Sequence, residues 1–319
     1  MENHYDAIII GAGAAGLTAG IYLSRAKVKT LILNEGAVGG QMVLTHEIAN
    51  YPGVDSISGY ELARNMKAQA QRFGCTIKSN IKITNINLNS KMKSVEVGGK
   101  LTYTSDAVII ATGGKSRTIG AKGEDLFKGK GISYCATCDG DFFTGKEIIV
   151  VGGGNSALEE AVSLTKYASK ITVIHQFDHF QALEHYVHEA KNNDKINFIM
   201  ESKVVEFYGE DSLNGVVIEN ARTGEQTDMK IDGAFIFIGY VPNTESIKEM
   251  VELNKYGEIV VDSNMHTSVE GVFAAGDSIA KRFRQVTTAV ADGTIAALSA
   301  SEYINNIKKE KKFEEPALV

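Results

Sequence analysis

The sequence lacks an excess of positive charge, a long apolar run and a signal-peptide layout. Its 319 residues carry a net charge of −6, which argues against a nucleic-acid binder because such proteins usually present a basic stripe. No apolar run is long enough to span a membrane. The first residues, Met1 to Asp6, lack the basic and then apolar layout of a signal peptide. We therefore expect a cytoplasmic protein that binds neither nucleic acid nor membrane.

Cysteine is also rare, and two of the three cysteines stand close together. Cys135, Ala, Thr and Cys138 are followed directly by Asp139. Half of a zinc site would need two further thiolate or imidazole ligands, and the only other cysteine is Cys75; a chance pair is the second alternative. Thiols at this spacing can close a small disulfide ring, and a lowered pKa lets one thiol attack other disulfides. A catalytic redox dithiol in a reducing compartment is the favoured interpretation.

The N-terminal segment has the order of elements that a dinucleotide-binding fold requires. A β-branched run at 7–10 leads into Gly11-Ala-Gly-Ala-Ala-Gly16, a helical stretch at 17–25 and a second strand at 30–33. In this context of strand, loop, helix and strand, the glycine pattern is a strong match. A glycine-rich turn without a ligand is the weaker alternative.

Each glycine of this first loop has an expected task. Gly11 permits the tight turn, Gly13 lets a pyrophosphate approach the backbone, and Gly16 lets the helix pack on the strand. The phosphate is expected at the helix N-terminus. An acidic side chain should then hold the ribose, and Glu35 is the candidate because Asn34 occupies the more usual position.

A second copy of the pattern begins near the middle of the chain. A strand at 147–151 precedes Gly152-Gly-Gly-Asn-Ser-Ala157, and a helix at 158–167 and a strand at 170–174 follow. Two such units in one chain imply two nucleotide-shaped pockets, at least by ancestry.

Further strand and helix patterns make the chain α/β throughout. Apolar strands are expected at 107–112 and 271–275, and a helix at 289–305. The charge-rich end, Lys308 to Glu315, is expected to be a solvated tail. The length suggests two domains, and the 44% of hydrophobic and 23% of charged residues are ordinary for a globular protein.

Four motifs in one order give the chain a resemblance to a known family. They are the Gly11 loop, Ala111-Thr-Gly113, Cys135 to Asp139, and Gly271 to Asp277. With these motifs the chain resembles the low-molecular-weight thioredoxin reductases over nearly its whole length. The glycine motifs alone would indicate only the wider class of flavoproteins with two dinucleotide-binding domains.

The resemblance implies an α/β fold with two Rossmann-like domains, the second inserted into the first. Residues 1–115 and 245–319 would form a discontinuous FAD-binding domain, and residues 116–244 the inserted redox domain that carries the dithiol. The resemblance also implies a homodimer. In this family the two domains rotate against each other, so that the dithiol alternates between facing the flavin and facing thioredoxin.

The resemblance further implies a set of FAD-binding residues beside the ribose candidate Glu35. Motif by motif, these residues are Gly11, Gly13, Gly16, Gly40, Gln41, Asn50, Ala111, Gly113, Gly276, Asp277, Arg284, Gln285 and Val286. A plain helix cap is the alternative role for Asp277. The helix that begins near Thr287 is expected to aim its N-terminal dipole at the pyrimidine side of the flavin, which would stabilise the anionic reduced form.

The same resemblance assigns roles at the dithiol. Cys138 would be the sulfur that faces the flavin, and the liberated Cys135 thiolate would attack the thioredoxin disulfide to give a mixed disulfide that Cys138 resolves. Asp139 would move protons to and from the thiols, which a carboxyl group can do when burial raises its pKa. Cys75 is expected to be a small buried apolar residue.

The second glycine loop departs from the family pattern where NADPH would be selected. NADPH-dependent members have a His-Arg-Arg stretch after this strand and a further arginine a few residues on, whereas residues 175–181 read His-Gln-Phe-Asp-His-Phe-Gln. No arginine occurs between Arg117 and Arg222, and Asn155 replaces the usual aspartate. Lysine lacks the bidentate fork that suits a phosphate. The sequence therefore argues against NADPH bound in the usual mode.

Several electron donors and reactions remain open. Flavoproteins that resemble thioredoxin reductase but take electrons from reduced ferredoxin show this pattern, and we favour ferredoxin as the donor. The basic loop Lys281 to Arg284 would help it to dock, and an ordinary solvated turn is the alternative for this loop. NADH, with Asp178 on the ribose, is the second candidate donor. An oxygen-dependent dithiol oxidase and a non-enzymatic flavin-bound sensor are the competing functions.

The altered stretch and the segment after it hold four histidines, which are His175, His179, His185 and His188. Spacings of four and three could bring pairs together on one helix face, as in a metal site. Because no cysteine or clear carboxylate partner accompanies them, we expect incidental surface histidines and no metal.

Overall fold

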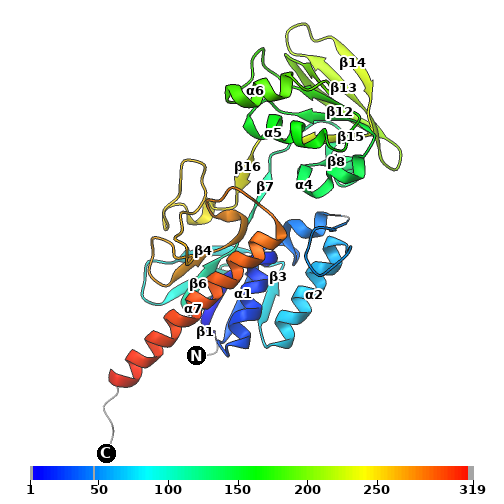
Figure 1. Ribbon diagram of the computed structural model, residues 1–319. Helices are drawn as coiled ribbons and strands as arrows, with labels where there is room; N and C mark the ends of the chain where they lie inside the picture. Colours follow the sequence, from blue (N-terminus) through cyan, green and yellow to red (C-terminus); the bar gives the residue numbers. More distant parts are fainter. Residues whose placement is uncertain (1–2, 46, 315–319) are drawn as a thin grey trace, which may run out of the picture. The chain divides into compact units, whose positions relative to one another are not determined.

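The computed structural model describes residues 3–45 and 47–314, and the chain divides into two compact units (Figure 1). Unit 1 consists of Met1–Lys115 and Val241–Val319, and unit 2 of Ser116–Tyr240. Each unit contains parallel strands with helices packed on them, which confirms the α/β class with two Rossmann-like units, the second inserted into the first. In the described part of the chain, no helix combines the length and the apolar character needed to cross a membrane.

A seven-stranded sheet lies at the centre of unit 1. Its strands are β1 (His4–Ile10), β2 (Thr30–Asn34), β3 (Thr76–Ser79), β4 (Ile83–Asn87), β5 (Lys93–Val97), β6 (Leu101–Ile110) and β17 (Val272–Ala274). They follow the order β3-β2-β1-β6-β5-β4, and β17 also pairs with β6. The pairs along β3-β2-β1-β6 and the β6–β17 pair are parallel, whereas β4–β5 and β5–β6 are antiparallel. Continuous apolar runs such as Ala7 to Ile10 are buried, as expected for parallel strands covered on both faces.

Helices pack on the sheet of unit 1. The helices and 3₁₀ turns described there are α1 (Ala14–Arg25), η1 (Gly40–Leu44), α2 (Gly59–Arg72), η3 (Glu245–Ile247), η4 (Gly276–Ser278) and α7 (Val286–Glu314). Ser58 caps α2 by accepting a hydrogen bond from the N–H of Glu61 at 3.2 Å. Helices α1 and α7 approach closely, since a Cβ on Gly293 would lie only 2.3 Å from the carbonyl oxygen of Ala15.

The last helix is longer than the sequence pattern predicts. It begins at Val286 and continues to Glu314, whereas the pattern predicts a helix at 289–305 and a solvated tail from Lys308. The predicted tail is part of α7 at residues 308–314, while residues 308–310 are exposed to solvent as predicted, and Glu315 lies outside the described residues. Lys308 Nζ lies 2.8 Å from Asp6 Oδ1 on β1, so this charged part of α7 is tied to the sheet by an ion pair.

Two sheets build unit 2. A parallel sheet in the order β11-β10-β9-β15-β8 contains β8 (Ile132–Ser133), β9 (Glu147–Val151), β10 (Lys170–Ile174), β11 (Ile196–Ile199) and β15 (Gly233–Ile236). An antiparallel sheet contains β12 (Ser202–Gly209), β13 (Leu213–Asn220) and β14 (Gln226–Lys230). A hydrophobic core formed by side chains of both sheets joins them.

Short helices complete unit 2. They are α3 (Glu124–Phe127), α4 (Ala136–Asp139), the 3₁₀ turn η2 (Gly140–Phe143), α5 (Asn155–Leu164) and α6 (Glu184–Lys191). Helices α5 and α6 pack on the parallel sheet and enclose a core of their own with it. The chain enters and leaves unit 2 through β7 (Gly114–Ser116) and β16 (Tyr240–Pro242), which pair with each other.

Candidate active site

The first glycine loop of unit 1 connects β1 to α1 and is closed tightly against β6. Gly11 has a φ of +109°, and a Cβ on it would lie 2.2 Å from the carbonyl oxygen of Ala111. A Cβ on Gly16 would meet the Gly11 carbonyl oxygen at 2.0 Å, whereas the space beside Gly13 is open. Gly13 is the N-cap of α1, and the first turn of this helix has neither a side-chain cap nor an acidic residue. Its backbone N–H groups can therefore bind an anion such as a phosphate.

The side chains at the end of β2 have separate tasks. Asn34 Oδ1 accepts a hydrogen bond from the N–H of Ala12 at 3.0 Å, and Asn34 Nδ2 donates to the Gly36 carbonyl at 2.6 Å. The exposed Glu35 accepts a hydrogen bond from the N–H of Ile83 at 3.0 Å. Asn34 thus shapes the glycine loop, a role that the sequence pattern does not reveal, while one carboxylate oxygen of Glu35 holds the start of β4.

Asp277 lies in an ion network beyond the carboxyl end of β17. Burial raises the pKa of its carboxyl group, and the charge of Lys281 opposes this rise. Lys281 Nζ lies 3.5 Å from Asp277 Oδ1 and 2.7 Å from Asp292 Oδ2. Asp277 Oδ1 is buried, and its contact of 3.5 Å with the Lys281 ammonium is too long for a strong hydrogen bond. Because Ala275 is the N-cap of η4 and no side chain caps that turn, this atom is better suited to a ligand hydroxyl than to a helix cap.

Further FAD candidates lie beside the first glycine loop. A Cβ on Gly40 would lie 3.2 Å from the Cα of Gly13, so the start of η1 adjoins the loop. Gln41 follows on η1 and is exposed. Gly113 comes directly after β6 with a φ of +60° and open space at its Cβ position. The structure therefore brings Gly40 and Ala111 against the loop that carries Gly11 and Gly13.

The FAD-binding candidates near the start of α7 form a second group in unit 1. Asn50 Nδ2 donates to Gln285 Oε1 at 3.4 Å. The Arg284 guanidinium forms an ion pair with Glu258. Val286 is the first residue of α7, so this group surrounds the positive end of the helix dipole.

The cysteine pair lies at the start of α4 in unit 2 as a disulfide. Cys135 and Cys138 are bonded, with Cα atoms 5.3 Å apart, and both are half-buried. Cys135 is the N-cap of α4, and its Sγ accepts a hydrogen bond from the N–H of Cys138 at 3.2 Å. Within residues 3–45 and 47–314, no cluster of three or more His, Cys, Asp or Glu side chains is arranged to hold a metal ion. Once this disulfide is reduced, its two thiols can exchange with other disulfides.

Asp139 ends α4, directly after the disulfide. Burial raises the pKa of its carboxyl group, a hydrogen bond from the Ser133 hydroxyl at 2.6 Å lowers it, and the charge of Asp141 raises it. A carboxyl group with a raised pKa holds its proton closer to neutral pH and can pass it to a nearby thiolate. The sequence pattern gives no signal for Ser133 except its place two residues before Cys135.

A neighbouring segment folds over the second glycine loop. A Cβ on Gly153 would lie 2.4 Å from Nδ1 of the His175 ring, so a larger residue would displace this ring. The N–H of Gln181 donates to the Gly153 carbonyl at 2.8 Å, and the N–H of Leu183 donates to Asn155 Oδ1 at 2.8 Å. The side chain that replaces the usual aspartate therefore anchors this segment to the loop.

Aromatic rings line the segment where the NADPH-dependent pattern has arginines. Phe177 and Phe180 pack on the His175 ring, with centroids 5.3 Å and 5.9 Å away. The expectation of incidental surface histidines is wrong for His175, which is buried, and this burial lowers the pKa of its imidazole. The carboxylate of Asp178 contacts the ring of His179, with 2.6 Å between Oδ1 and Nδ1.

The chain is similar to known proteins over nearly its whole length. The family described as "Pyridine nucleotide-disulphide oxidoreductase" matches residues 5–293. The thioredoxin reductase of Peptoclostridium acidaminophilum is 45% identical over 322 residues, covering 99% of this chain and all of that protein. A "34.2 kDa protein in rubredoxin operon" of Clostridium pasteurianum is 46% identical over 303 residues, covering 95% and 98% of the two chains. The crystal structure of thioredoxin reductase from Streptococcus pyogenes superposes with a TM-score of 0.92 at 41% identity, covering 96% of this chain and 100% of that one.

Proposed function

Because the chain belongs to the pyridine nucleotide-disulphide oxidoreductase family, and within it to the low-molecular-weight thioredoxin reductases, we propose that it reduces the disulfide of thioredoxin. Electrons would pass from FAD through Cys135 and Cys138. The protein binds FAD, as flavoproteins of this family do. The observation that carries the proposal is the half-buried disulfide at the start of α4, next to a carboxyl group of raised pKa on Asp139.

The residues of unit 1 fit an FAD molecule. Its pyrophosphate would bind at the N-terminus of α1, where the N–H groups after Gly13 have no capping side chain. Asp277 Oδ1 would accept a hydrogen bond from a hydroxyl of the cofactor, and Glu35 would hold the ribose. Asn50 and the segment 284–286 would surround the isoalloxazine ring, with the N-terminus of α7 stabilising negative charge on it. When bound, FAD supplies the electron pair that opens the disulfide.

The chemistry at the thiols balances with two electrons and two protons, which convert the disulfide into two thiols. Cys138 would face the flavin, so that Cys135 leaves as a thiolate whose charge the N–H of Cys138 stabilises. Asp139 would supply a proton to the thiols and take one back. The Cys135 thiolate then attacks thioredoxin, and Cys138 resolves the mixed disulfide, which releases reduced thioredoxin and restores the Cys135–Cys138 bond.

We assign these two halves of the reaction to two domains. Residues 1–115 and 245–319 would form the FAD-binding domain, and residues 116–244 the redox domain. Rotation about the crossings β7 and β16 would let the dithiol face the flavin and thioredoxin in turn. The protein would act in the cytoplasm as a homodimer.

The electron donor is proposed to be reduced ferredoxin instead of a pyridine nucleotide. Phe177 stands at an arginine position of the NADPH-dependent pattern, and its ring packs on His175. Arg222, whose charge acts on Asp178, is already paired with Glu201. The NADH alternative depends on Asp178, whose carboxylate is hydrogen-bonded to the neighbouring imidazole. These contacts favour a donor that delivers electrons directly to the flavin.

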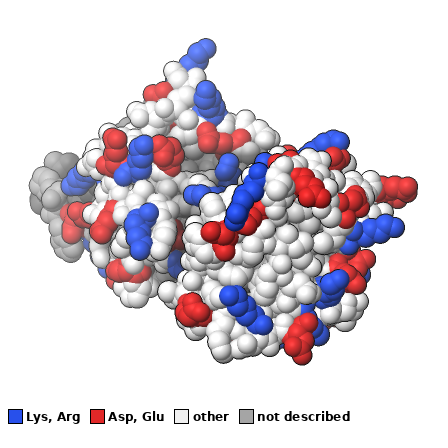
Figure 2. All heavy atoms as spheres, turned by 90° about the horizontal axis from the view of Figure 1, so that it is seen from above, with Lys and Arg blue, Asp and Glu red and all other residues white. Residues whose placement is uncertain are grey.

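Two of the three cations in the basic loop Lys281 to Arg284 are engaged in ion pairs within unit 1. Lys281 and Arg284 form ion pairs inside unit 1 with Asp292 and Glu258, whereas Arg282 is exposed. Basic and acidic side chains are interspersed on the face drawn in Figure 2. We propose that this loop, whose exposed positions include Arg282, helps an acidic ferredoxin to dock.

Anaerobic reduction of the bound FAD tests both parts of the proposal. Photoreduced ferredoxin, NADPH and NADH are added separately to the oxidised protein, and oxidised thioredoxin is added after the flavin has bleached. We expect bleaching by ferredoxin alone and recolouring by thioredoxin, with recolouring lost in Cys138→Ser. Fast bleaching by either nucleotide would contradict the donor, and failure of thioredoxin to recolour the flavin would contradict the reductase. Turnover of small dithiols with oxygen would instead favour a dithiol oxidase.

A further inference from the structure

The hydroxyl of Ser133 links the carboxyl group after the disulfide to the backbone before it. Ser133 ends β8 with only 6% of its surface exposed. Its Oγ accepts a hydrogen bond from the N–H of Cys135 at 3.0 Å, and it lies 2.6 Å from Asp139 Oδ2 and 3.3 Å from the Cys135 carbonyl oxygen. A hydroxyl has one proton to donate, and the shorter contact to Asp139 takes it.

We propose that Ser133 is a positioning residue, whose hydroxyl holds the Asp139 carboxyl group beside the dithiol and adjusts to its protonation state. This inference rests on the proposed role of Asp139 as the acid and base for the thiols. With Asp139 ionised, the Ser133 O–H donates to Oδ2. When Asp139 takes up a proton, the same O–H can turn to the Cys135 carbonyl, so that the bond from the Cys135 N–H is kept in both states.

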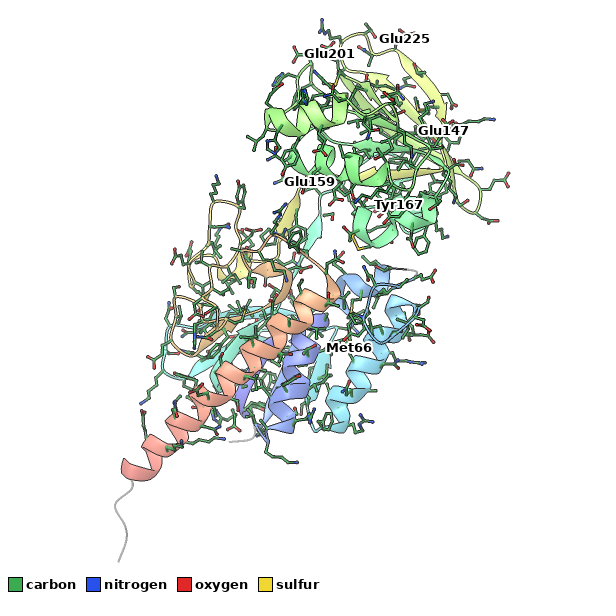
Figure 3. The ribbon with its side chains drawn as sticks, viewed as in Figure 1. Met66, Glu147, Glu159, Tyr167, Glu201 and Glu225 are labelled. Carbon is green, nitrogen blue, oxygen red and sulfur yellow. A yellow bond between two sulfur atoms is a disulfide. The ribbon has the colours of Figure 1, made fainter. Side chains whose placement is uncertain are left out.

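The surroundings of Asp139 make this hydroxyl the chief group that favours its ionised form. Burial and the negative charge of Asp141 on η2 raise the pKa of Asp139, and the Ser133 hydrogen bond is the effect that lowers it. Helix α5, which packs against α4, carries the acidic Glu159 and Glu160. Beyond α5, the ring of Tyr167 covers the end of α4, since a Cβ on Gly140 would lie 3.0 Å from it (Figure 3).

Removal of the hydroxyl should therefore shift the titration of Asp139 in a defined direction. Ser133→Ala should raise the pKa of Asp139, because it removes the hydrogen bond that stabilises the ionised carboxylate. Burial and the charge of Asp141, which both raise this pKa, are then no longer offset by that bond. Ser133→Thr keeps a hydroxyl on the same carbon and should titrate like the native protein. Ser202→Ala is the matched control, because Ser202 is a serine of the same unit with 4% exposure, and it bonds only the Met200 carbonyl in the contacts described.

The experiment is a carboxyl ¹³C NMR titration of the oxidised, FAD-loaded protein, with the Asp139 signal identified by its loss in Asp139→Asn. We expect an upward shift of the midpoint in Ser133→Ala and none in Ser133→Thr or Ser202→Ala. The rate of thioredoxin reduction by the pre-reduced protein gives a second readout. The step in its pH profile that disappears in Asp139→Asn should move to higher pH in Ser133→Ala and stay in place in Ser133→Thr and Ser202→Ala.

An unchanged midpoint in Ser133→Ala would overturn the inference, and so would a Ser133→Thr shift as large as that of Ser133→Ala. Where the Ala variant does not fold, Ser133→Val, which has the shape of Thr without the hydroxyl, takes its place: its midpoint should rise, and an unchanged midpoint would overturn the inference. Failure of the proposed function has a different signature, since the native protein would then not reduce thioredoxin, and failure of the acid–base role alone would leave Asp139→Asn at the native rate at every pH. The NMR shift would still decide whether Ser133 controls the protonation of Asp139.

Discussion

Replacement of Lys281 by methionine tests whether the ion network next to the first glycine loop stabilises unit 1. The side chain of Lys281 is 13% exposed, and those of its partners Asp292 and Asp277 are 14% and 27% exposed. Breaking a buried pair from one side costs about 3–5 kcal/mol, whereas exposed pairs contribute about 0–1 kcal/mol. Because the three side chains are mostly but not fully buried, we expect a loss of about 3 kcal/mol in the free energy of unfolding.

Urea unfolding of the FAD-loaded protein, followed by far-ultraviolet circular dichroism, measures this loss. With a slope of about 3 kcal/mol per molar urea, the midpoint should fall by about 1 M. Lys248→Met is the matched control, because its partner Glu245 is 86% exposed in an isolated surface pair. This control should leave the urea midpoint nearly unchanged, because solvent screens an exposed ion pair.

The deficit of Lys281→Met should also depend on pH. Burial raises the pKa of Asp277 in the folded protein, so its protonated form favours folding and this contribution is lost as pH rises. In the native protein the positive charge of Lys281 stabilises the ionised form of Asp277. In Lys281→Met this charge is missing, so the pKa of Asp277 in the folded protein rises further. The deficit should therefore be largest near neutral pH and shrink as pH falls toward the ordinary carboxyl value of 3.8. A midpoint equal to that of Lys248→Met, or a deficit independent of pH, would refute the reasoning.

Three further predictions concern the loop, the acid and the free thiol. Gly11→Ala should abolish FAD retention, because its Cβ would lie 2.2 Å from the Ala111 carbonyl oxygen, whereas Gly98→Ala, with a φ of +64° but open space, should retain flavin absorbance after gel filtration. Asp139→Asn should slow thioredoxin reduction by about a hundredfold or more, and native rates in stopped-flow assays would exclude a proton-transfer role. Burial raises the pKa of the Cys75 thiol to about 11, so the oxidised native protein should resist iodoacetamide at neutral pH and expose one reactive thiol on unfolding.

The parts of the fold that the sequence predicts well depend on local patterns. The strands predicted at 147–151 and 170–174 coincide with β9 and β10, because continuous β-branched runs bounded by polar residues suit strands buried on both faces. The two glycine loops are likewise placed by short-range order, since each follows a strand directly and opens a helix. Such patterns establish the α/β class without knowledge of any distant contact.

Contacts between distant segments were not predictable in the same way. Asn34 reads as a missing acidic residue, yet its amide group is bonded to the glycine loop, a role that depends on how β2 and α1 are placed. Lys308 belongs to a charged run that resembles a solvated tail, and only the path of α7 brings it to Asp6. Ser133 belongs to no recognisable motif. Its role depends on the turn between β8 and α4, which brings the Asp139 carboxyl group within hydrogen-bonding distance of its hydroxyl.

The insertion of unit 2 into unit 1 has a consequence for the order of events during translation. The ribosome completes Ser116–Tyr240 before β17 and α7 have been synthesised, and domains generally fold as units while the chain emerges. The dithiol unit can therefore fold on the ribosome while the sheet of unit 1 still lacks a strand, and α1 still lacks the helix that packs against it. Because the proposed FAD site includes Asp277 and the segment 284–286, we expect FAD to bind last. A chain that stops before Val286 should contain the dithiol unit but fail to retain FAD.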